Sequence, residues 1–437
     1  MRSLYKDKFL FSGNNSTRKE LAVKDCWITS IYPYFRSLNV NQLMAQITSH
    51  SSEQPILRDH KKELYAVCIA LSVLGLVYSS WAARVPDIRD TAVLTAATLG
   101  YALLMRGSGT LIMMPIVATS INRFGAKRTA LVCGLLVVST LLPIAFMNNW
   151  IALGFLLMII GACTSGFNIS INALGSKVEA ETGSSQMSKI HSWFGIGNLT
   201  GALIGLIMVR FNVSTEIHYL VMTVFILIIL AFIYPYLPND APHPDTERPK
   251  FQWPHGGLIA IGIICFLAAS IEGSINNWIG LFFTDHLQIA DGYEAIGYSV
   301  FAGTLLISRI VGDRLKNRFG AKKILVTGGL SAGAGILIAT FSPNIVIASI
   351  GIAIAGAGVA FNFPMIFSAA GREGAIALTS VATFGYVGGM VSQPVVGLIV
   401  EEFELLGGFI FISLCSFIVA ILAYKARLLK PAPNHNQ

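Results

Sequence analysis

One hexapeptide occurs twice in the chain, as Asn122-Arg123-Phe124-Gly125-Ala126-Lys127 and as Asn317-Arg318-Phe319-Gly320-Ala321-Lys322, at an offset of 195 positions. Each copy lies between two long apolar runs, where its glycine permits a tight turn between antiparallel helices. The pairs Gly161-Ala162 and Gly356-Ala357 repeat at the same offset. An offset that recurs through half the chain indicates a duplicated unit.

The apolar runs around these copies are long enough to cross a membrane, since a spanning helix needs about 20 mostly apolar residues. The chain is 54% apolar and 12% charged, with a mean hydropathy of +0.65, whereas soluble proteins carry about 25% charged residues. The runs are too long for porin strands of about 10 residues. We therefore predict an all-α membrane protein with 12 transmembrane helices in two pseudo-symmetric six-helix bundles. The expected spans are Leu64–Ala83, Ala97–Thr119, Thr129–Phe146, Trp150–Leu174, Ile190–Val209, Ile217–Leu237, Gly257–Leu281, Ala295–Val311, Ile324–Phe341, Ile345–Ala370, Ala375–Val400 and Leu405–Tyr424.

Composition shifts divide the chain into five parts. We predict a polar N-terminal extension (1–63), an N-terminal bundle (64–237), a Pro-rich cytoplasmic linker (238–256), a C-terminal bundle (257–425) and a cytoplasmic tail (426–437). With both termini in the cytoplasm, 26 Lys and Arg residues lie on that side and 3 on the other. This asymmetry fixes the orientation by the positive-inside rule and favours a bacterial inner membrane. The net charge of +8 therefore reflects topology and does not indicate a nucleic-acid partner.

The repeated loop resembles the Gly-x-x-x-Asp-Arg-x-Gly-Arg-Lys signature of the major facilitator superfamily, with Asn122 and Asn317 at the Asp position. A closer resemblance to the YbjJ-like subgroup covers roughly Leu64 to Ala426. It rests on the segments Ser80–Asp90, Glu272–Trp278, Phe363-Pro364, Ser368–Ala370, Val381–Thr383 and Gly385-Tyr386. This resemblance implies a transporter whose spans one, four, seven and ten line a central cavity.

The loop residues and one embedded arginine are candidates for gating. The loop set is Asn122, Arg123, Gly125, Lys127, Asn317, Arg318, Gly320 and Lys322. A basic turn that only fixes topology remains the alternative for the loops. Arg309 lies in span eight, where the subgroup also has Arg, and is a gate or ion partner unless it snorkels to the membrane surface. Arg106 lies deeper and lacks a counterpart in the subgroup, so it ranks lower.

Glu272 is the carboxylate that lies well inside an apolar run. Holding it charged there costs about 2.5–3.5 kcal/mol on insertion scales, which favours a proton-carrying role. A structural carboxylate paired with Arg106 or Arg309 is the alternative. His191 at the start of span five is the second candidate for proton coupling; an ordinary helix-end histidine explains it equally well.

Polar and aromatic side chains on spans one, four, seven and ten are the candidates for substrate binding. Four are amides, and Asn168 and Asn172 share a helix face because they are four residues apart. Hydrogen bonding between helices is their alternative role, and Trp81 and Trp278 could instead anchor the membrane interface. The full set is Asn168, Asn172, Asn276, Asn362, Ser80, Trp81 and Trp278.

These features predict a secondary active transporter that moves a small polar organic solute by alternating access, coupled to protons, with a sugar-like molecule as the first expectation for the solute. Efflux of amphipathic compounds and a non-transporting solute sensor or scaffold are the alternatives. No nucleophile–base pair and no metal-ligand spacing is found in the sequence, so we expect no enzyme activity, cofactor or metal. The expected partners are the small-molecule substrate, protons and membrane lipid, with the chain acting as a monomer.

Overall fold

The computed structural model describes residues 60–183, 186–240, 255–289, 292–293 and 295–429. The chain separates into two units, Met1–Asp59 and His60–Gln437, and all that follows concerns the second. Most of the predicted N-terminal extension, linker and tail lies outside the described residues, and the last four residues of the predicted extension belong to the first described helix.

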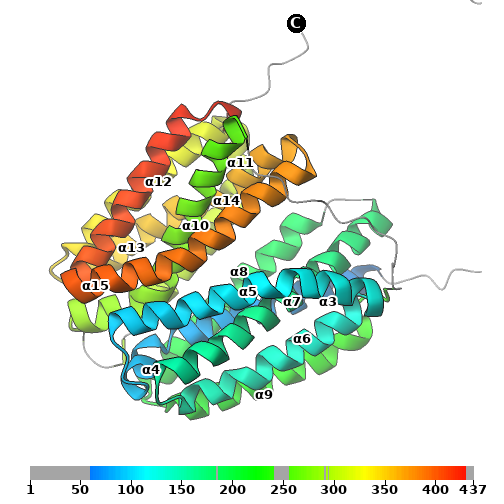
Figure 1. The fold of residues 1–437 in the computed structure, drawn as a ribbon, viewed down its shortest axis with the longest axis horizontal. Helices are drawn as coiled ribbons and strands as arrows, with labels where there is room; N and C mark the ends of the chain where they lie inside the picture. Colours follow the sequence, from blue (N-terminus) through cyan, green and yellow to red (C-terminus); the bar gives the residue numbers. More distant parts are fainter. Residues whose placement is uncertain (1–59, 184–185, 241–254, 290–291, 294, 430–437) are drawn as a thin grey trace, which may run out of the picture. The chain divides into compact units, whose positions relative to one another are not determined.

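The described residues are helical, and each predicted span has a helical counterpart (Figure 1). Helix α3 begins four residues before the predicted first span, α10 has the predicted bounds, and α7 and α11 each end eight residues after the predicted spans. The first half contains α3 (His60–Ala82), α4 (Val85–Thr91), α5 (Ala96–Phe124), α6 (Ala126–Leu141) with η1 (Leu142–Phe146), α7 (Trp150–Thr182), α8 (Met187–Arg210), and α9 (Thr215–Ile233) with η2 (Tyr234–Tyr236).

The second half repeats this order, with two departures from simple spans. Span ten consists of two helices. Spans eleven and twelve follow each other directly within α15, and the chain changes direction at Glu404, whose φ of 59° is rare for an L residue. The elements are α10 (Gly257–Leu281) with the π-helical turn η3 (Phe282–His286), α11 (Ile296–Phe319), α12 (Ala321–Thr340), α13 (Ile345–Val359), α14 (Asn362–Arg372), α15 (Ala375–Lys425) and η4 (Arg427–Leu429).

Ten helices among the described residues are long and apolar enough to cross a membrane. Helix α15 accounts for two predicted spans, and α11 has a shorter apolar part, Ile296–Gly312. These two facts reconcile ten helices with twelve predicted spans. The all-α membrane fold expected from the sequence is therefore confirmed.

Residues that are equivalent under the repeat form the same turns and helix caps in the two halves. Gly125 and Gly320 have φ of 84° and 78° and lie between α5 and α6 and between α11 and α12. Asn149 caps α7 by accepting a hydrogen bond from the Ala152 amide, and Asn344 caps α13 in the same way. Because Asn side chains satisfy the free amides of a helix start, the duplication extends to the helix caps.

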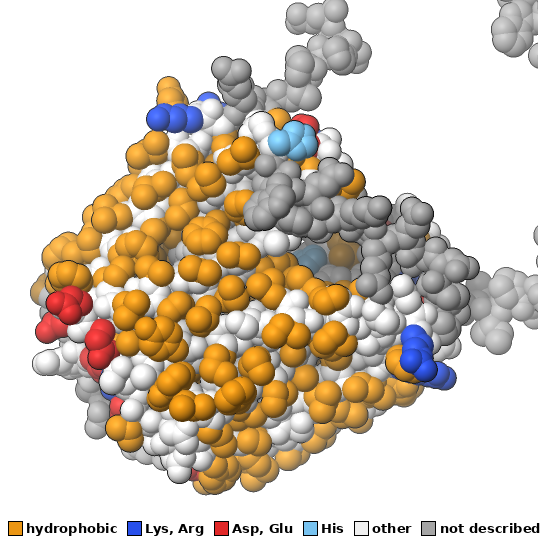
Figure 2. All heavy atoms as spheres, viewed as in Figure 1, with side chains coloured by type: hydrophobic (Ala, Val, Ile, Leu, Met, Phe, Trp, Pro, Cys, Tyr) orange, Lys and Arg blue, Asp and Glu red, His pale blue; other side chains and the backbone are white. Residues whose placement is uncertain are grey.

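Charge separates the two ends of the helices, while apolar side chains cover the sides. Figure 2 shows hydrophobic residues over most of the visible face, with Lys and Arg mainly at one end and acidic residues at the other. We call the end that carries the Gly125 and Gly320 loops and Lys425 the basic end. The end with Asp87, Asp285 and Glu401 is the acidic end. A chain with this pattern has the surface that a lipid bilayer requires.

The two halves pack along α5 against α15 and along α8 against α11. Small residues allow the first contact: a Cβ added to Gly100 would lie 2.7 Å from the Gln393 carbonyl oxygen, and one added to Gly397 would lie 2.6 Å from the Ala96 carbonyl oxygen. On the second contact, the Tyr298 hydroxyl donates to Asn198 at 2.7 Å. These close contacts set the boundary on which the candidate site is built.

Candidate functional site

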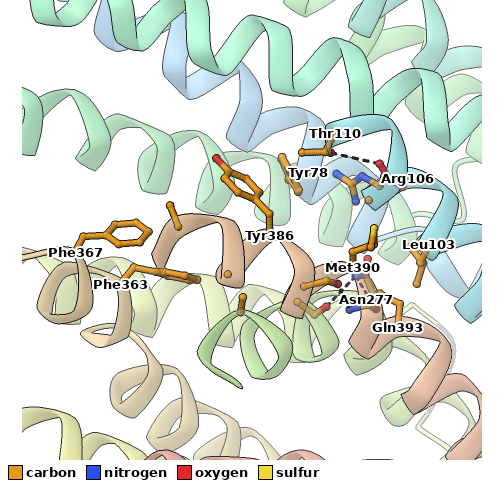
Figure 3. A pocket seen from close by; sticks show the side chains of 16 residues that line it. Tyr78, Leu103, Arg106, Thr110, Asn277, Phe363, Phe367, Tyr386, Met390 and Gln393 are labelled. Carbon is orange, nitrogen blue, oxygen red and sulfur yellow. Dashed lines mark hydrogen bonds between the residues drawn. The ribbon is translucent and has the colours of Figure 1, made fainter. Parts of the chain in front are cut away.

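A cavity of about 400 Å³ lies between the two halves, within the range of small-molecule sites. Figure 3 shows its side chains, which come from α3, α5, α10, α14 and α15. Four aromatic rings and several small residues make most of the wall apolar. The lining residues are Tyr78, Leu103, Arg106, Gly107, Thr110, Ala269, Gly273, Asn277, Phe363, Phe367, Ala382, Gly385, Tyr386, Gly389, Met390 and Gln393.

Arg106 is the charged residue of this lining. Its guanidinium carbon lies 4.4 Å from the centre of the Tyr78 ring, a distance at which the ring face attracts a cation. No acidic side chain of the described residues forms an ion pair with Arg106. The sequence analysis ranked Arg106 below Arg309 because it lacks a counterpart in the YbjJ-like subgroup, whereas the structure places it in the cavity wall.

Two amides close the acidic end of the cavity through bonds to two tryptophans. The Trp81 indole donates to the Asn277 oxygen at 3.0 Å, which joins the two halves. Asn277 donates to the Gln393 oxygen at 3.2 Å, and the Trp278 indole donates to the same oxygen at 3.3 Å. Both tryptophans are buried, so neither faces lipid as an interface anchor would. Neither lines the main cavity, although both were predicted to contact substrate.

Glu272 lies in a second, adjoining cavity of about 240 Å³, which Asn276, Asn198, Tyr298 and Tyr78 also line. Both of its carboxylate oxygens lie 3.3 Å from the same terminal nitrogen of Arg309. The side chains are 17% and 26% exposed, respectively. The structure thus places two predicted residues together and identifies Arg309 as the partner of Glu272.

Arg309 also contacts the junction between the two helices of span ten. Its Nε donates to the Ala360 carbonyl oxygen at 3.4 Å. In a regular helix that carbonyl would accept from the amide of residue 364, but Pro364 has no amide hydrogen. Arg309 therefore supplies the donor that proline removes, and it links α10, α11 and the α13–α14 junction.

The remaining predicted polar residues lie elsewhere. Asn172 donates to the Asn168 side-chain oxygen at 2.6 Å, and neither residue lines the two cavities described above. The expectation that span four lines the cavity is therefore wrong for these cavities. The helices that line these two cavities lie at the boundary between the halves, and α7 contributes no lining residue to either cavity.

Ser80 and Asn362 are buried, and His191 is exposed. The Ser80 hydroxyl donates to the Leu76 carbonyl oxygen at 2.7 Å, a bond within its own helix. The side-chain oxygens of Asn276 and Asn362 have no hydrogen-bond partner among the described residues. Asn276 therefore stays a candidate for solute contact, because it faces the cavity that holds Glu272.

The two copies of the repeated loop have different surroundings. Lys127 donates to the Leu237 carbonyl oxygen at 2.9 Å and lies 5.0 Å from the Tyr234 ring centre. The Asp240 carboxylate accepts from the Ala126 amide at 2.6 Å, at the start of α6. The first copy is thus bound to the chain that follows span six.

In the second copy, Lys322 lies 4.9 Å from the Tyr424 ring centre. Arg123 and Arg318 each lie over the ring of the following phenylalanine, at 5.3 and 5.2 Å. A Cβ added at Gly320 would meet no atom within 4 Å, whereas one at Gly125 would lie 3.0 Å from the Asp240 carbonyl oxygen. The lysine–tyrosine contact is therefore common to both copies, and the contact with the following chain belongs to the first.

His60, Glu63 and Glu181 form the one acidic–histidine group of metal-binding size in the described part of the chain. His60 Nδ1 lies 3.4 Å from Glu63 and 3.8 Å from Glu181. The group joins α3 to the end of α7 at the basic end, away from both cavities. Ion pairs between helix ends account for this arrangement.

Contacts between the halves concentrate at the acidic end. Arg89 on α4 forms an ion pair with Asp285 in η3, and the Ala97 amide donates to Glu401 at 3.0 Å. Pro86 lies against Gly280, where an added Cβ would be 3.2 Å from the proline ring. These contacts close the acidic end of the boundary between the halves.

Comparison with known proteins agrees with this architecture. Residues 65–374 match the model of the Major Facilitator Superfamily. An uncharacterized MFS-type transporter of Yersinia pestis is 29% identical over 81% of this chain and 93% of its own length. The membrane protein MosC of Rhizobium meliloti is 27% identical over 82% and 89%.

Among solved structures, the nucleoside transporter NupG superposes with a TM-score of 0.66 at 15% identity, over 84% of this chain and 99% of that one. FucP in the outward conformation gives 0.57 at 13% identity, over 83% and 98%. The duplicated six-helix halves, the cavity between them and the family match over most of the chain lead to one conclusion: this chain belongs to the Major Facilitator Superfamily of membrane transporters.

Proposed function

We propose that the chain is a proton-linked secondary transporter that moves a small organic solute by alternating access. The observation that carries this proposal is a cavity between two related halves, with contacts that close one end. In such folds, two bundles rock about a site near the middle of the membrane. With the basic end in the cytoplasm, as the positive-inside rule requires, the closed acidic end faces outward.

The Glu272–Arg309 pair supports the proton linkage. A carboxylate within a span is costly unless it is paired or protonated, and Glu272 is paired with Arg309 at 3.3 Å. With Glu272 charged, Arg309 binds both the carboxylate and the Ala360 carbonyl. Protonation of Glu272 removes the ionic attraction to Arg309, while Arg309 keeps its hydrogen bond to the Ala360 carbonyl in span ten. Protonation therefore changes the contacts between α10, α11 and the α13–α14 junction. His191 remains the second proposed proton site.

The comparisons support transport and leave the cargo open. One solved relative is a nucleoside transporter, another is a fucose:proton symporter, and monocarboxylate transporter 12 of mouse is 24% identical over 44% of this chain. A sugar-like cargo was expected from the Asn, Ser and Trp side chains of the spans, and none of the residues in that predicted set lines the main cavity. A small polar organic solute therefore remains the proposed class, with efflux and solute sensing as rivals.

Glu272→Gln tests the proposal because it keeps the volume and hydrogen bonding of the side chain but cannot ionise. In proteoliposomes the wild type should show counterflow of a labelled solute and accumulate it under a pH gradient. The variant should keep counterflow and lose accumulation. The matched control is Glu402→Gln at the exposed acidic end, which should behave as wild type.

The outcomes separate the alternatives. Equal accumulation by Glu272→Gln and wild type would refute the coupling role of Glu272 and make His191 the next group to test. A protein that binds solute in a thermal-shift screen but shows no counterflow would be a sensor or scaffold. The direction of accumulation under an inward proton gradient distinguishes uptake from efflux.

A further inference from the structure

We infer that the main cavity binds an organic anion: an oxyanion group, of which a carboxylate is the simplest, contacts Arg106, and an apolar or aromatic body lies against the rings of the wall. This rests on the proposed transport function and specifies the chemical class of its cargo. The residues that carry it are Arg106, Tyr78, Phe363 and Tyr386.

The first argument is charge. The structure describes all sixteen residues that line the cavity, and Arg106 is the one among them that carries a charge at neutral pH. The nearby carboxylate of Glu272 belongs to the adjoining cavity and is bound by Arg309 at 3.3 Å. Arg106 is half-buried, and a charge within a span is costly unless an opposite charge lies beside it. A bound monoanion would supply the missing countercharge.

The second argument is the geometry of the guanidinium. The guanidinium carbon of Arg106 lies over the Tyr78 ring at 4.4 Å, a contact that holds the guanidinium without using its N–H groups. Among the described residues no side chain or carbonyl accepts a hydrogen bond from it. The Thr110 hydroxyl donates to the backbone oxygen of Arg106, not to the side chain (Figure 3). The planar donor fork is thus free to bind a carboxylate with two hydrogen bonds.

The third argument is the rest of the wall. Figure 3 shows Tyr386, Phe363 and Phe367 on the side of the cavity away from Leu103. These rings offer area for an apolar or aromatic body, while Asn277 and Gln393 offer polar atoms near the acidic end. Pockets that orient small ligands combine a mainly apolar wall with a few polar groups in this way. A small inorganic anion would leave the aromatic wall unused.

The test is a thermal-shift titration of purified full-length protein at constant ionic strength. The probes are benzoate, phenylacetate and indole-3-acetate, each paired with its uncharged amide. At least one acid should raise the melting temperature of wild type, and its amide should raise it less. Arg106→Gln should weaken the apparent Kd of that acid about tenfold or more, as expected for the loss of a charge-assisted contact. Arg106→Lys, which keeps the charge but not the fork, should give an intermediate Kd.

Arg314→Gln is the matched control, since Arg314 is exposed near the basic end, and it should respond as wild type. The inference is overturned if no acid stabilises the protein, if amides stabilise it as well as acids, or if Arg106→Gln responds as wild type. The melting temperature without ligand shows whether each variant is folded. If acids bind through Arg106 and no counterflow occurs, the anion site stands and the transport proposal falls. If Arg106→Gln exchanges a neutral solute as wild type does, transport stands and the anion site falls.

Discussion

Replacing Arg309 by Met tests whether the Glu272–Arg309 pair stabilises the fold as well as linking helices. At 3.3 Å and an effective dielectric constant of about 20, the attraction between unit charges is about 5 kcal/mol before desolvation. The desolvation of both groups offsets part of this, and the partial exposure of both side chains screens the rest. We expect a net coupling of about 2 kcal/mol.

The single variants should differ from the double variant. Arg309→Met leaves a carboxylate without its partner and the Ala360 carbonyl without a donor, and should lower the free energy of unfolding by about 3 kcal/mol. Glu272→Gln leaves Arg309 its bond to Ala360 and should cost about 1 kcal/mol. The double variant Glu272→Gln with Arg309→Met buries no charge at this site. It should cost about 2 kcal/mol, less than the sum of the two single changes.

The measurement is equilibrium unfolding of the four proteins in mixed SDS micelles, followed by tryptophan fluorescence. The double-mutant cycle gives the coupling free energy directly. Additive costs, within about 0.5 kcal/mol, would refute the energetic role of the pair. Melting temperatures in a mild detergent provide an independent check that all four proteins begin from a folded state.

Three further predictions follow from other parts of the structure. Gly100→Val should separate α5 from α15 at the acidic end, because its Cβ alone would lie 2.7 Å from a carbonyl oxygen. In a cysteine-free background that carries Asn277→Cys, the added thiol should then react faster with a membrane-impermeant maleimide added outside. Unchanged labelling would contradict this prediction. Arg84→Met should lower the free energy of unfolding by about 2–4 kcal/mol, because the buried Arg84 donates to the Val213 carbonyl at 2.6 Å and to His218 at 3.0 Å; an SDS titration showing a loss below about 1 kcal/mol would argue against it. A reporter active only outside the cytoplasm should be silent when fused after Lys430, and strong activity there would mean that the termini lie on opposite sides of the membrane.

The fold can be predicted well from the sequence because each span is recognised from its own residues. The length and hydropathy of a span depend on residues that are neighbours in the chain, and so do helix caps such as Asn149 and Asn344. The repeat at an offset of 195 positions then shows that the second half has the same arrangement as the first. The structure differs from the predicted spans where contacts between distant parts of the chain determine the path of the backbone. At Glu404 the chain reverses direction within the acidic segment Glu401–Glu404, so two spans are joined at one non-helical residue. Pro364 divides span ten, and Arg309 supplies the donor that proline removes.

The site is predicted less completely, because hydropathy does not show which way a spanning helix is rotated. Glu272 and Arg309 were found because charge is conspicuous in an apolar run, and the structure pairs them. In the sequence, Asn168 and Asn172 have the same features as the other candidates for substrate binding, but in the structure their side chains hydrogen-bond to each other. Arg106 could have been identified by asking which embedded charge lacks an opposite charge on any span, since Glu272 can neutralise only one arginine.

The bond from Trp81 to Asn277 has a thermodynamic consequence for any solute in the cavity. Asn277 lines the cavity and also joins the halves at the acidic end. Because an amide oxygen can accept two hydrogen bonds, a solute that donates to Asn277 shares this oxygen with the Trp81 indole. Under the proposed alternating access, opening of the acidic end breaks the Trp81 bond, and the solute is then bound to an oxygen that has lost its other partner. The dissociation constant of such a solute is therefore expected to differ between the closed and the open state of that end.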